Sequence, residues 1–231
     1  MVMPRIAIVA ALEREVRPLI KHWRANDREY SGRRFRFYEN GDAVAVCGGI
    51  GPEAARRATE AILASYESAI VYSVGYAGAL DPSLKVAEVV RPARVINTKD
   101  GSSVQIHGGN GVLVSHDIVA TTGQKSKLRD AYGAQAVDME ASGVARAAEG
   151  RGVPFQAMKV ISDEVGFELP ETGRFISADG HFRELGFALF VAVRPWLWFR
   201  VLQLARNSVR AAGSLCAELQ KVVSSHLPAP G

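Results

Sequence analysis

Several carboxylate side chains stand where an apolar run of the sequence meets polar residues, and such groups can transfer protons. Asp163 follows the apolar run 155–161, and Glu15 follows the run 6–11. A carboxyl group in a partly apolar crevice has a raised pKa and can act as a general acid or base near neutral pH. A solvated strand end or a helix cap would place the same residues there, so residue type and position leave both interpretations open.

Glu140 has unusual neighbours for a solvated glutamate, because Met139 precedes it and small residues follow it in AVDMEASG. Its two carboxylate oxygens suit a pair of sugar hydroxyls, and a salt bridge on a helix surface is the alternative. Glu13 and Glu15 stand at the start of a predicted helix, where acidic side chains interact favourably with the helix dipole in any case.

The glycine-rich turn 48–51, followed by Pro52, resembles a phosphate-binding turn at a helix N-terminus. It does not fit the GxGxxG pattern, and it lacks both the lysine of a P-loop and the acidic residue about 20 positions later that holds a ribose. We therefore expect no dinucleotide cofactor, and the glycines would permit tight packing beside a site. Cys47 and Cys216 lie far apart without a CxxC motif, so we expect neither a structural metal site nor a disulfide framework.

Apolar, β-branched runs alternate with alanine-rich stretches, which is typical of an α/β sheet with helices on both faces. Strands are predicted at residues 6–11, 34–38, 43–47, 69–74, 86–91, 95–97, 112–115 and 153–161. Helices are predicted at 12–23, from Pro52 onward, and at 138–149, and Ala136 and Val137 open the last of these. Turns are predicted at 40–41 and 75–78, and a loop is predicted at 101–111. Ligands bind at the carboxyl ends of strands in such sheets, where Glu15 and Asp163 would lie.

Length and composition indicate one globular domain over residues 1–231. Hydrophobic residues make up 48% of the chain and charged residues 23%, as in ordinary globular proteins. The net charge is +4 with scattered arginines, and no zinc finger or RNA-binding aromatic motif is present, so nucleic-acid binding is not expected. The N-terminal apolar run lacks a basic leader, so we interpret it as the first strand of a cytoplasmic protein and not as a signal peptide.

Five ordered segments between Ile6 and Val165 together resemble a known family. They are IAIVAALEREV, CGGIGPEAARRA, SVGYAGALDPSLKVAEVV, AVDMEASGVARAA and VPFQAMKVISDEV. This order is similar to that of nucleoside phosphorylases and methylthioadenosine/S-adenosylhomocysteine nucleosidases. The resemblance implies a single α/β domain with a central mixed twisted sheet flanked by helices, and an enzyme that cleaves the N-glycosidic bond of purine nucleosides.

The resemblance also implies roles for individual residues. Asp163 would protonate N7 of the purine, and Glu140 would bind the ribose hydroxyls with Met139 against the sugar face. The substrate would also meet four further residues: Tyr76, Gly78, Phe155 and Ser162.

Glu15 aligns with the glutamate that nucleosidases of this family use to activate water. Phosphorylases need cationic groups at that place, and the neighbouring Arg14 and Arg17 are expected to point away from Glu15 on a helix. A carboxylate repels a phosphate dianion and suits a water molecule, so hydrolysis is favoured. Phosphorolysis, with ribose 1-phosphate as the product, is the alternative.

Three positions depart from the family pattern. Tyr76 stands where the nucleosidases have a small serine, Lys159 stands where they have arginine, and the segment 115–119 lacks the aromatic residue that stacks on the base. A protein that binds nucleosides without cleaving them is therefore a further alternative.

The C-terminal segment 185–223 is apolar and helical in pattern, and we assign it to the same domain. Its apolar run 185–193 is too short to span a bilayer, and Pro195 interrupts it. Trp196, Trp198 and Phe199 cluster after the proline, with arginines on other faces. An amphipathic helix packed on the sheet explains this pattern, and a membrane-surface element peripheral to the inner membrane is the alternative.

This segment also resembles the C-terminus of the hopanoid-associated phosphorylase subgroup. That subgroup is thought to remove adenine from adenosylhopane during hopanoid lipid biosynthesis. The resemblance implies a nucleoside substrate with a large apolar group on its 5′ carbon. It also implies a homodimer, because neighbouring subunits often complete the 5′ pocket in the family.

Overall fold

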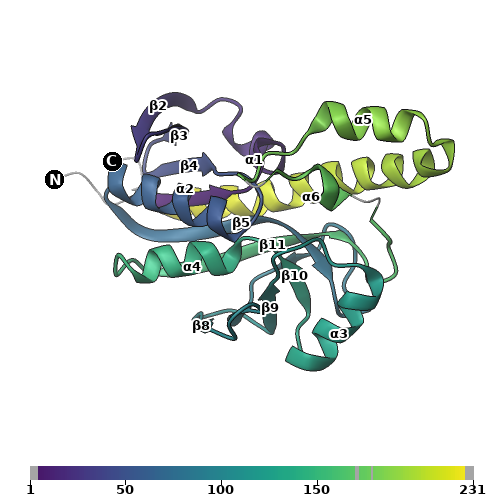
Figure 1. Cartoon of the computed structure of the whole chain (residues 1–231). Helices are drawn as coiled ribbons and strands as arrows, with labels where there is room; N and C mark the ends of the chain where they lie inside the picture. The colour runs from purple at the N-terminus through teal and green to yellow at the C-terminus, as the bar shows by residue number, and fades with distance from the viewer. Residues whose placement is uncertain (1–4, 170–171, 178, 227–231) are drawn as a thin grey trace.

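The structure is a computed structural model that describes residues 5–169, 172–177 and 179–226. It has one central mixed sheet with helices on both faces, drawn in Figure 1. The predicted fold class, a single α/β domain with a mixed sheet, is confirmed.

The strands alternate with helices along most of the chain. The strands are β1 (Arg5–Ala10), β2 (Arg24–Tyr30), β3 (Arg33–Asn40), β4 (Ala43–Cys47), β5 (Ser68–Ala79), β6 (Val89–Val90), β7 (Arg94–Asn97), β8 (Ser103–Gln105), β9 (Val112–Ser115), β10 (Ala136–Asp138) and β11 (Phe155–Asp163). The helices are α1 (Glu13–Ile20), α2 (Pro52–Ser65), α3 (Thr122–Tyr132), α4 (Ala141–Glu149), α5 (Glu184–Ala192) and α6 (Pro195–His226), with a short 3-10 helix η1 (Thr172–Phe175).

The long strand β5 joins the parts of the sheet. Its first half, up to Ser73, pairs parallel with β1, its residues 71–78 pair parallel with β11, and its last residues pair antiparallel with β10. From β10 the sheet continues through β9 and β7 to β8, and from β1 it continues through β4 and β3 to β2. The carboxyl ends of β1 and β11 therefore point the same way and lie beside the second half of β5, where the candidate site lies.

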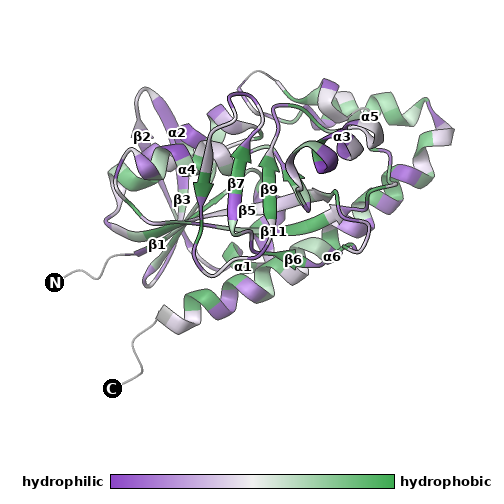
Figure 2. Cartoon of the chain, turned by 90° about the horizontal axis from the view of Figure 1, so that it is seen from below, coloured by the Kyte–Doolittle hydropathy of each residue, from purple (hydrophilic) through white to green (hydrophobic). Residues whose placement is uncertain are grey.

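The two faces of the sheet are covered by different pairs of helices. Ile6 and Ile8 of β1 face the layer formed by α1 and α6, where they join a cluster with Val16 and Leu215. Their alternate neighbours face α2 and α4, because successive side chains of a strand point to opposite faces. Figure 2 shows the central strands as mainly hydrophobic, and burial on both faces requires such sequences.

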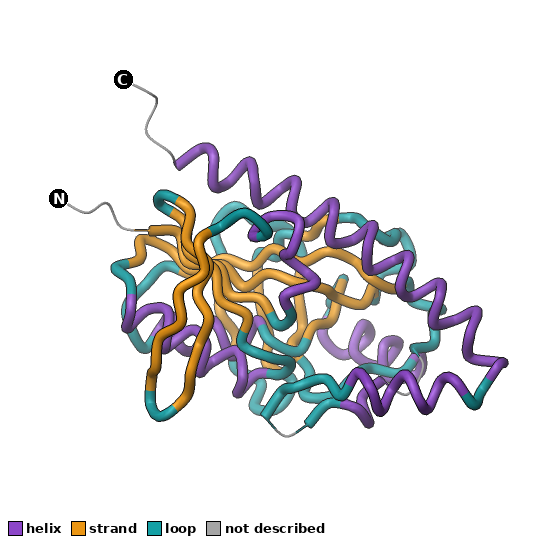
Figure 3. The backbone as a smooth tube through the Cα atoms, turned by 90° about the horizontal axis from the view of Figure 1, so that it is seen from above, coloured by secondary structure: helices purple, strands orange, loops and turns teal. Residues whose placement is uncertain are grey.

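Helix α6 has two halves with different environments. In its C-terminal half, Ala211, Leu215, Leu219 and Val223 are buried against the sheet. No residue of α5 is buried, and α5 and the first half of α6 form a hairpin that extends past the strands in Figures 1 and 3. Among the described residues, no helix is both long and apolar enough to cross a membrane.

Some elements differ from the predictions. Residues 75–78 continue β5 and do not form a turn, and 136–138 form the strand β10 and do not open a helix. The strand β2 and the helix α3 are polar, exposed elements whose sequences carried no apolar periodicity. The predicted loop 101–111 contains the short strand β8.

We expect Leu215→Ala to lower the free energy of unfolding by about 2–5 kcal/mol, because the change leaves a cavity in the core between α6 and the sheet. Leu202→Ala in the exposed half of the same helix is the matched control and should change stability by less than about 0.5 kcal/mol. Denaturant unfolding measures both variants. Equal effects would contradict the division of α6 into a buried and an exposed half.

Candidate active site

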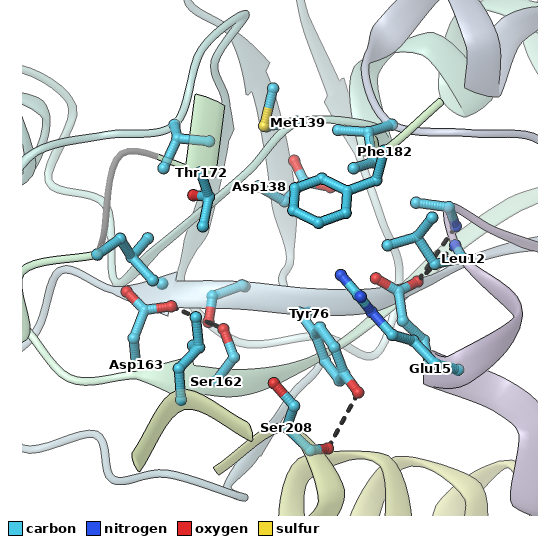
Figure 4. A pocket seen from close by; sticks show the side chains of 18 of the residues that line it. Leu12, Glu15, Tyr76, Asp138, Met139, Ser162, Asp163, Thr172, Phe182 and Ser208 are labelled. Carbon is cyan, nitrogen blue, oxygen red and sulfur yellow. Dashed lines mark hydrogen bonds between the residues drawn. The ribbon is translucent and has the colours of Figure 1, made fainter. Parts of the chain in front are cut away.

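A cavity of about 900 Å³ lies at the end of the sheet, between the strand ends and the α5–α6 hairpin. Seven of the eight predicted site residues line it: Glu15, Tyr76, Gly78, Met139, Glu140, Ser162 and Asp163. They come from β5, β11, α1 and the turn between β10 and α4. The cavity thus brings together side chains from distant parts of the chain, as Figure 4 shows.

Asp163 reaches the cavity because β11 contains a bulge. Ile161 pairs with Ala77 and Asp163 pairs with Gly78, so Ser162 is an extra residue on the β11 side. A bulge changes which way the following side chains point. Ile161 therefore faces the core, whereas Asp163 lines the cavity and is only 3% exposed.

Both carboxylate oxygens of Asp163 have a partner. Ser162 Oγ donates to Oδ1 at 2.7 Å, and Lys125 Nζ of α3 donates to Oδ2 at 2.5 Å. Gly78 leaves room for this pair, because a Cβ at position 78 would lie 3.0 Å from Asp163 Oδ2 and 3.2 Å from Lys125 Cε. No pattern in the sequence marks Lys125, because it stands among the polar residues of α3.

Glu140 is held at the N-terminus of α2. The backbone N–H of Gly51 donates to Glu140 Oε1 at 2.9 Å, so the glycine-rich turn 48–51 binds a carboxyl group of the site. Gly49 and Gly51 have φ values of +102° and +100°, which favour glycine. Burial raises the pKa of Glu140 to about 8, with Lys159 opposing the shift and Asp138 adding to it.

Lys159 and Asp138 form a fully buried ion pair that connects β11 to β10. Lys159 Nζ lies 2.8 Å from Asp138 Oδ2, and the same oxygen accepts the backbone N–H groups of Glu140 and Ala141. Ser115 Oγ donates to the other oxygen of Asp138. Asp138 therefore fixes the turn that carries Glu140. In the sequence, Lys159 stands out only as a departure from the family arginine, and no pattern marks Asp138 for this role.

Glu15, at the start of α1, lies near Lys159 in the same site. Its Oε2 accepts the backbone N–H groups of Ala11 and Leu12, both at 3.2 Å. Gly75 has a φ of +132°, and a Cβ there would lie 2.8 Å from Glu15 Oε2, so the glycine provides the space for this carboxyl group. Burial raises the pKa of Glu15, and the positive charges of Lys159 and Arg14 reduce that rise.

Arg14 also lines the cavity, so the expectation that it points away from Glu15 was wrong. Its guanidinium lies over the ring of Phe182, 5.4 Å from the ring centroid. Arg17 lines the cavity as well, because the wall formed by the α5–α6 hairpin surrounds the first turns of α1. The sequence analysis could not place this wall.

Tyr76 connects the sheet to α6. Its hydroxyl donates to the backbone carbonyl oxygen of Ser208 at 3.0 Å, and Figure 4 shows the ring between Asp163 and Glu15 in that view. Burial raises the pKa of the Tyr76 hydroxyl, so it stays protonated and keeps this hydrogen bond over the physiological range.

Phe155 does not lie at the cavity. It begins β11, at the end of the strand opposite to Asp163, and its ring packs against two clusters of the hydrophobic core. Its closeness in sequence to the motif at 162–163 does not bring it to the site, because Phe155 and Asp163 are the two ends of a nine-residue extended strand. Among the described residues, no group of three or more His, Cys, Asp or Glu side chains could hold a metal ion.

We expect Glu140→Gln to make stability less dependent on pH. The folded chain keeps the proton of Glu140 up to about pH 8, whereas the unfolded chain loses it near the ordinary value of 4.5. The free energy of unfolding of the wild type therefore falls with rising pH across this window, by up to about 1.4 kcal/mol per pH unit from this group. Unfolding measured from about pH 5 to about pH 8 should show a shallower fall for the variant.

Glu29→Gln is the control for this experiment, because Glu29 is exposed on β2. Its pH dependence should match that of the wild type. Parallel curves for Glu140→Gln and the wild type would contradict a proton held by Glu140.

Comparisons with known proteins agree with this architecture. Residues 5–115 and 109–190 match the family model of the phosphorylase superfamily. A 5′-methylthioadenosine/S-adenosylhomocysteine nucleosidase of Staphylococcus aureus is 26% identical over 207 residues, which are 71% of this chain and 90% of the relative.

Two solved structures are similar over nearly the whole chain. A 5′-methylthioadenosine/S-adenosylhomocysteine nucleosidase from Helicobacter pylori, with butyl-thio-DADMe-Immucillin-A, has a TM-score of 0.72 at 17% identity and covers 97% of this chain and 100% of its own. A futalosine hydrolase of the same organism has a TM-score of 0.71 at 17% identity and covers 96% and 98%. At these identities the likeness shows the fold. The family model matches well over half of the residues of this chain, and the chain therefore belongs to an enzyme superfamily, the phosphorylase superfamily.

Proposed function

We propose that this chain hydrolyses the N-glycosidic bond of an adenosine with an apolar group on its 5′ carbon, and so releases adenine. One observation carries the proposal: Asp163, Glu140 and Glu15 line a single cavity whose opposite wall is formed by apolar helices. Similarity to relatives named as nucleosidases supports the same reaction class.

Asp163 acts on the leaving base in this proposal. A proton delivered to N7 of the purine neutralises the charge that develops on the base as the glycosidic bond breaks. The carboxylate is held by Ser162 and Lys125 but keeps further lone pairs for a ligand. The ribose then passes through an oxocarbenium-like state.

Glu140 binds the ribose hydroxyls, and Met139 packs on the sugar face. With a pKa of about 8, the carboxyl group of Glu140 is mainly neutral at pH 7. A neutral carboxyl group both donates and accepts hydrogen bonds, which suits a pair of sugar hydroxyls. Gly51 occupies one of its oxygens and so fixes its orientation.

Glu15 activates the water molecule that attacks the sugar. Its raised pKa makes it a better base than a solvated glutamate. Three buried carboxyl groups, those of Glu15, Asp138 and Glu140, surround the single ammonium group of Lys159. A phosphate dianion would enter a region that already has more acidic than basic side chains, whereas water is neutral.

Phosphorolysis is the second candidate reaction, and one observation favours it. Arg14, Arg17 and Lys21 line the cavity on the α1 side, next to Glu15. These cations could bind a phosphate at the outer edge of the cluster. The product of the reaction distinguishes the two candidates.

The apolar wall of the cavity suits a large hydrophobic 5′ group. Phe187 of α5 and Val201, Leu204 and Val209 of α6 line it. The volume of about 900 Å³ is near the upper end of the usual range for ligand sites, about 300–1,000 Å³. Together with the resemblance of the C-terminal segment to the hopanoid-associated subgroup, this supports adenosylhopane as the substrate, in hopanoid lipid biosynthesis.

The exposed surface of the α5–α6 hairpin favours contact with a membrane surface in the cytoplasm. Large apolar side chains there are mostly exposed, with Leu185 at 83% and Trp196 and Phe199 above 70%. Arg194 and Arg200 lie next to these side chains, and arginines beside exposed aromatic rings suit an anionic lipid surface. A lipid-linked nucleoside could then reach the cavity along the hairpin. A homodimer that covers the same surface is the competing interpretation.

We expect the wild type to release adenine from 5′-deoxy-5′-octylthioadenosine without phosphate and to yield a free ribose derivative. Asp163→Asn should lower kcat about 10²–10⁴-fold, because an amide cannot deliver the proton. Glu164→Gln, which changes the adjacent and solvent-exposed carboxylate, should keep wild-type activity. Chromatography of adenine and of the sugar product measures each case.

A strict requirement for phosphate, with a ribose 1-phosphate derivative as product, would replace hydrolysis by phosphorolysis. Binding of the nucleoside without any turnover would contradict both reactions. It would favour the interpretation of a nucleoside-binding protein without catalytic activity.

We expect the protein to sediment with vesicles that contain phosphatidylglycerol and to bind pure phosphatidylcholine vesicles more weakly. The double variant Trp196→Ala and Phe199→Ala should bind at least about tenfold more weakly. It lacks the two exposed aromatic side chains whose transfer from water to the lipid surface stabilises binding. The double variant Gln220→Ala and Ser224→Ala is the control on the exposed face of the other half of α6. A homodimer in solution that binds neither kind of vesicle would contradict the membrane contact.

A further inference from the structure

Lys125 is a buried cation beside the proposed acid, Asp163. Its Nζ donates to Asp163 Oδ2 at 2.5 Å and to the backbone carbonyl oxygen of Glu164 at 2.9 Å. Both side chains of the ion pair are nearly inaccessible, at 1% for Lys125 and 4% for Asp163. The pair nevertheless lines the cavity, so a ligand bound there would touch it.

Burial of Lys125 is unfavourable if its only role is to stabilise the fold. Lys125 and Leu128 are the only buried residues of this otherwise exposed helix. Taking an ammonium and a carboxylate out of water is unfavourable, and an apolar pair of similar volume would often be as stable. A structural contact between α3 and β11 would therefore not require a lysine.

The ion pair poses a chemical problem for the proposed reaction. In this contact Lys125 is the donor and Asp163 is the acceptor, so the proton between them belongs to the lysine. A carboxylate has no proton to give to the leaving purine. The ammonium of Lys125 holds three N–H groups, and one of them already points at Asp163 Oδ2.

We propose that Lys125 is the positioning residue that supplies the proton which Asp163 passes to the leaving base. As the glycosidic bond breaks, its electron pair moves to the purine, an N–H bond of Lys125 breaks and an O–H bond forms on Asp163. The O–H bond then breaks as the N7–H bond forms. Lys125 is left as a neutral amine. After adenine leaves, Lys125 takes a proton from solvent, and the proton that Glu15 took from the attacking water returns to solvent, so the cycle balances. This inference rests on the proposed N-glycosidic cleavage.

The surroundings of Lys125 allow this transfer. Asp163 of β11 is the one charged side chain in ion-pair contact with it among the described residues. Glu164 contributes only its backbone oxygen, because its carboxylate pairs with Lys85, and the charged residues of α3 itself face solvent. The other buried carboxyl groups of the site, those of Glu15, Asp138 and Glu140, interact with Lys159.

The test compares two leaving groups on the same 5′-octylthio ribose. Adenine needs a proton in order to leave, whereas 4-nitrophenolate leaves without one. Lys125→Met should lower kcat for adenine release about 10²–10³-fold with little change in KM, and should lower 4-nitrophenolate release less than about tenfold. Lys127→Met, on the exposed face of α3, should leave both rates unchanged.

Lys125→Arg separates proton supply from charge alone. A guanidinium can pair with Asp163 but does not give up its proton at neutral pH. We expect Lys125→Arg to release 4-nitrophenolate at close to the wild-type rate, and this result would show an intact site. The same variant should release adenine at least about tenfold more slowly than the wild type. Lys125→Gln serves in the same assay if either variant fails to fold.

Three results would overturn the inference. They are full adenine release by Lys125→Met, full adenine release by Lys125→Arg, or equal losses with both leaving groups in all folded variants. If the wild type releases neither leaving group, the proposed function itself fails, and that result is distinct from a failure of Lys125 alone.

Discussion

The buried ion pair between Lys159 and Asp138 organises the end of the sheet on which the site is built. It joins β11 to β10, and the same Asp138 oxygen accepts two backbone N–H groups at the start of α4. Glu140 sits in that turn, and its carboxyl group meets the N-terminus of α2 through Gly51. Removing one partner of such a pair would leave a buried charge uncompensated, which is strongly unfavourable. The position of Glu140 thus depends on a contact between two strands.

The excess of carboxyl groups over cations follows from this arrangement. Lys159 is the only fully buried ammonium near Glu15, Asp138 and Glu140 in the described part of the chain. Burial penalises each negative charge, and so Glu140 retains its proton near neutral pH. The carboxyl groups of the site therefore lie in different environments, and such groups can take different roles in a reaction.

The cavity combines this polar strand end with an apolar wall from the last two helices. The C-terminal half of α6 belongs to the core of the sheet, and this anchors the other half beside the site. Tyr76 adds a hydrogen bond from β5 to Ser208 near the boundary between the halves. The hairpin thus gains its position from α6, although its own apolar side chains remain exposed.

Apolar periodicity and ordered motifs are local features of a chain, so they predicted the fold class, the principal strands and seven residues that line the cavity. Glu15, Glu140 and Asp163 could be identified in this way. Four features could not be predicted from local sequence: the bulge at Ser162, the reach of Lys125 from a polar helix, the inward position of Arg14 and the location of Phe155 in the core. Each of these depends on which elements lie side by side. A lysine in a polar helix has the same local sequence whether its ammonium meets water or a buried carboxylate.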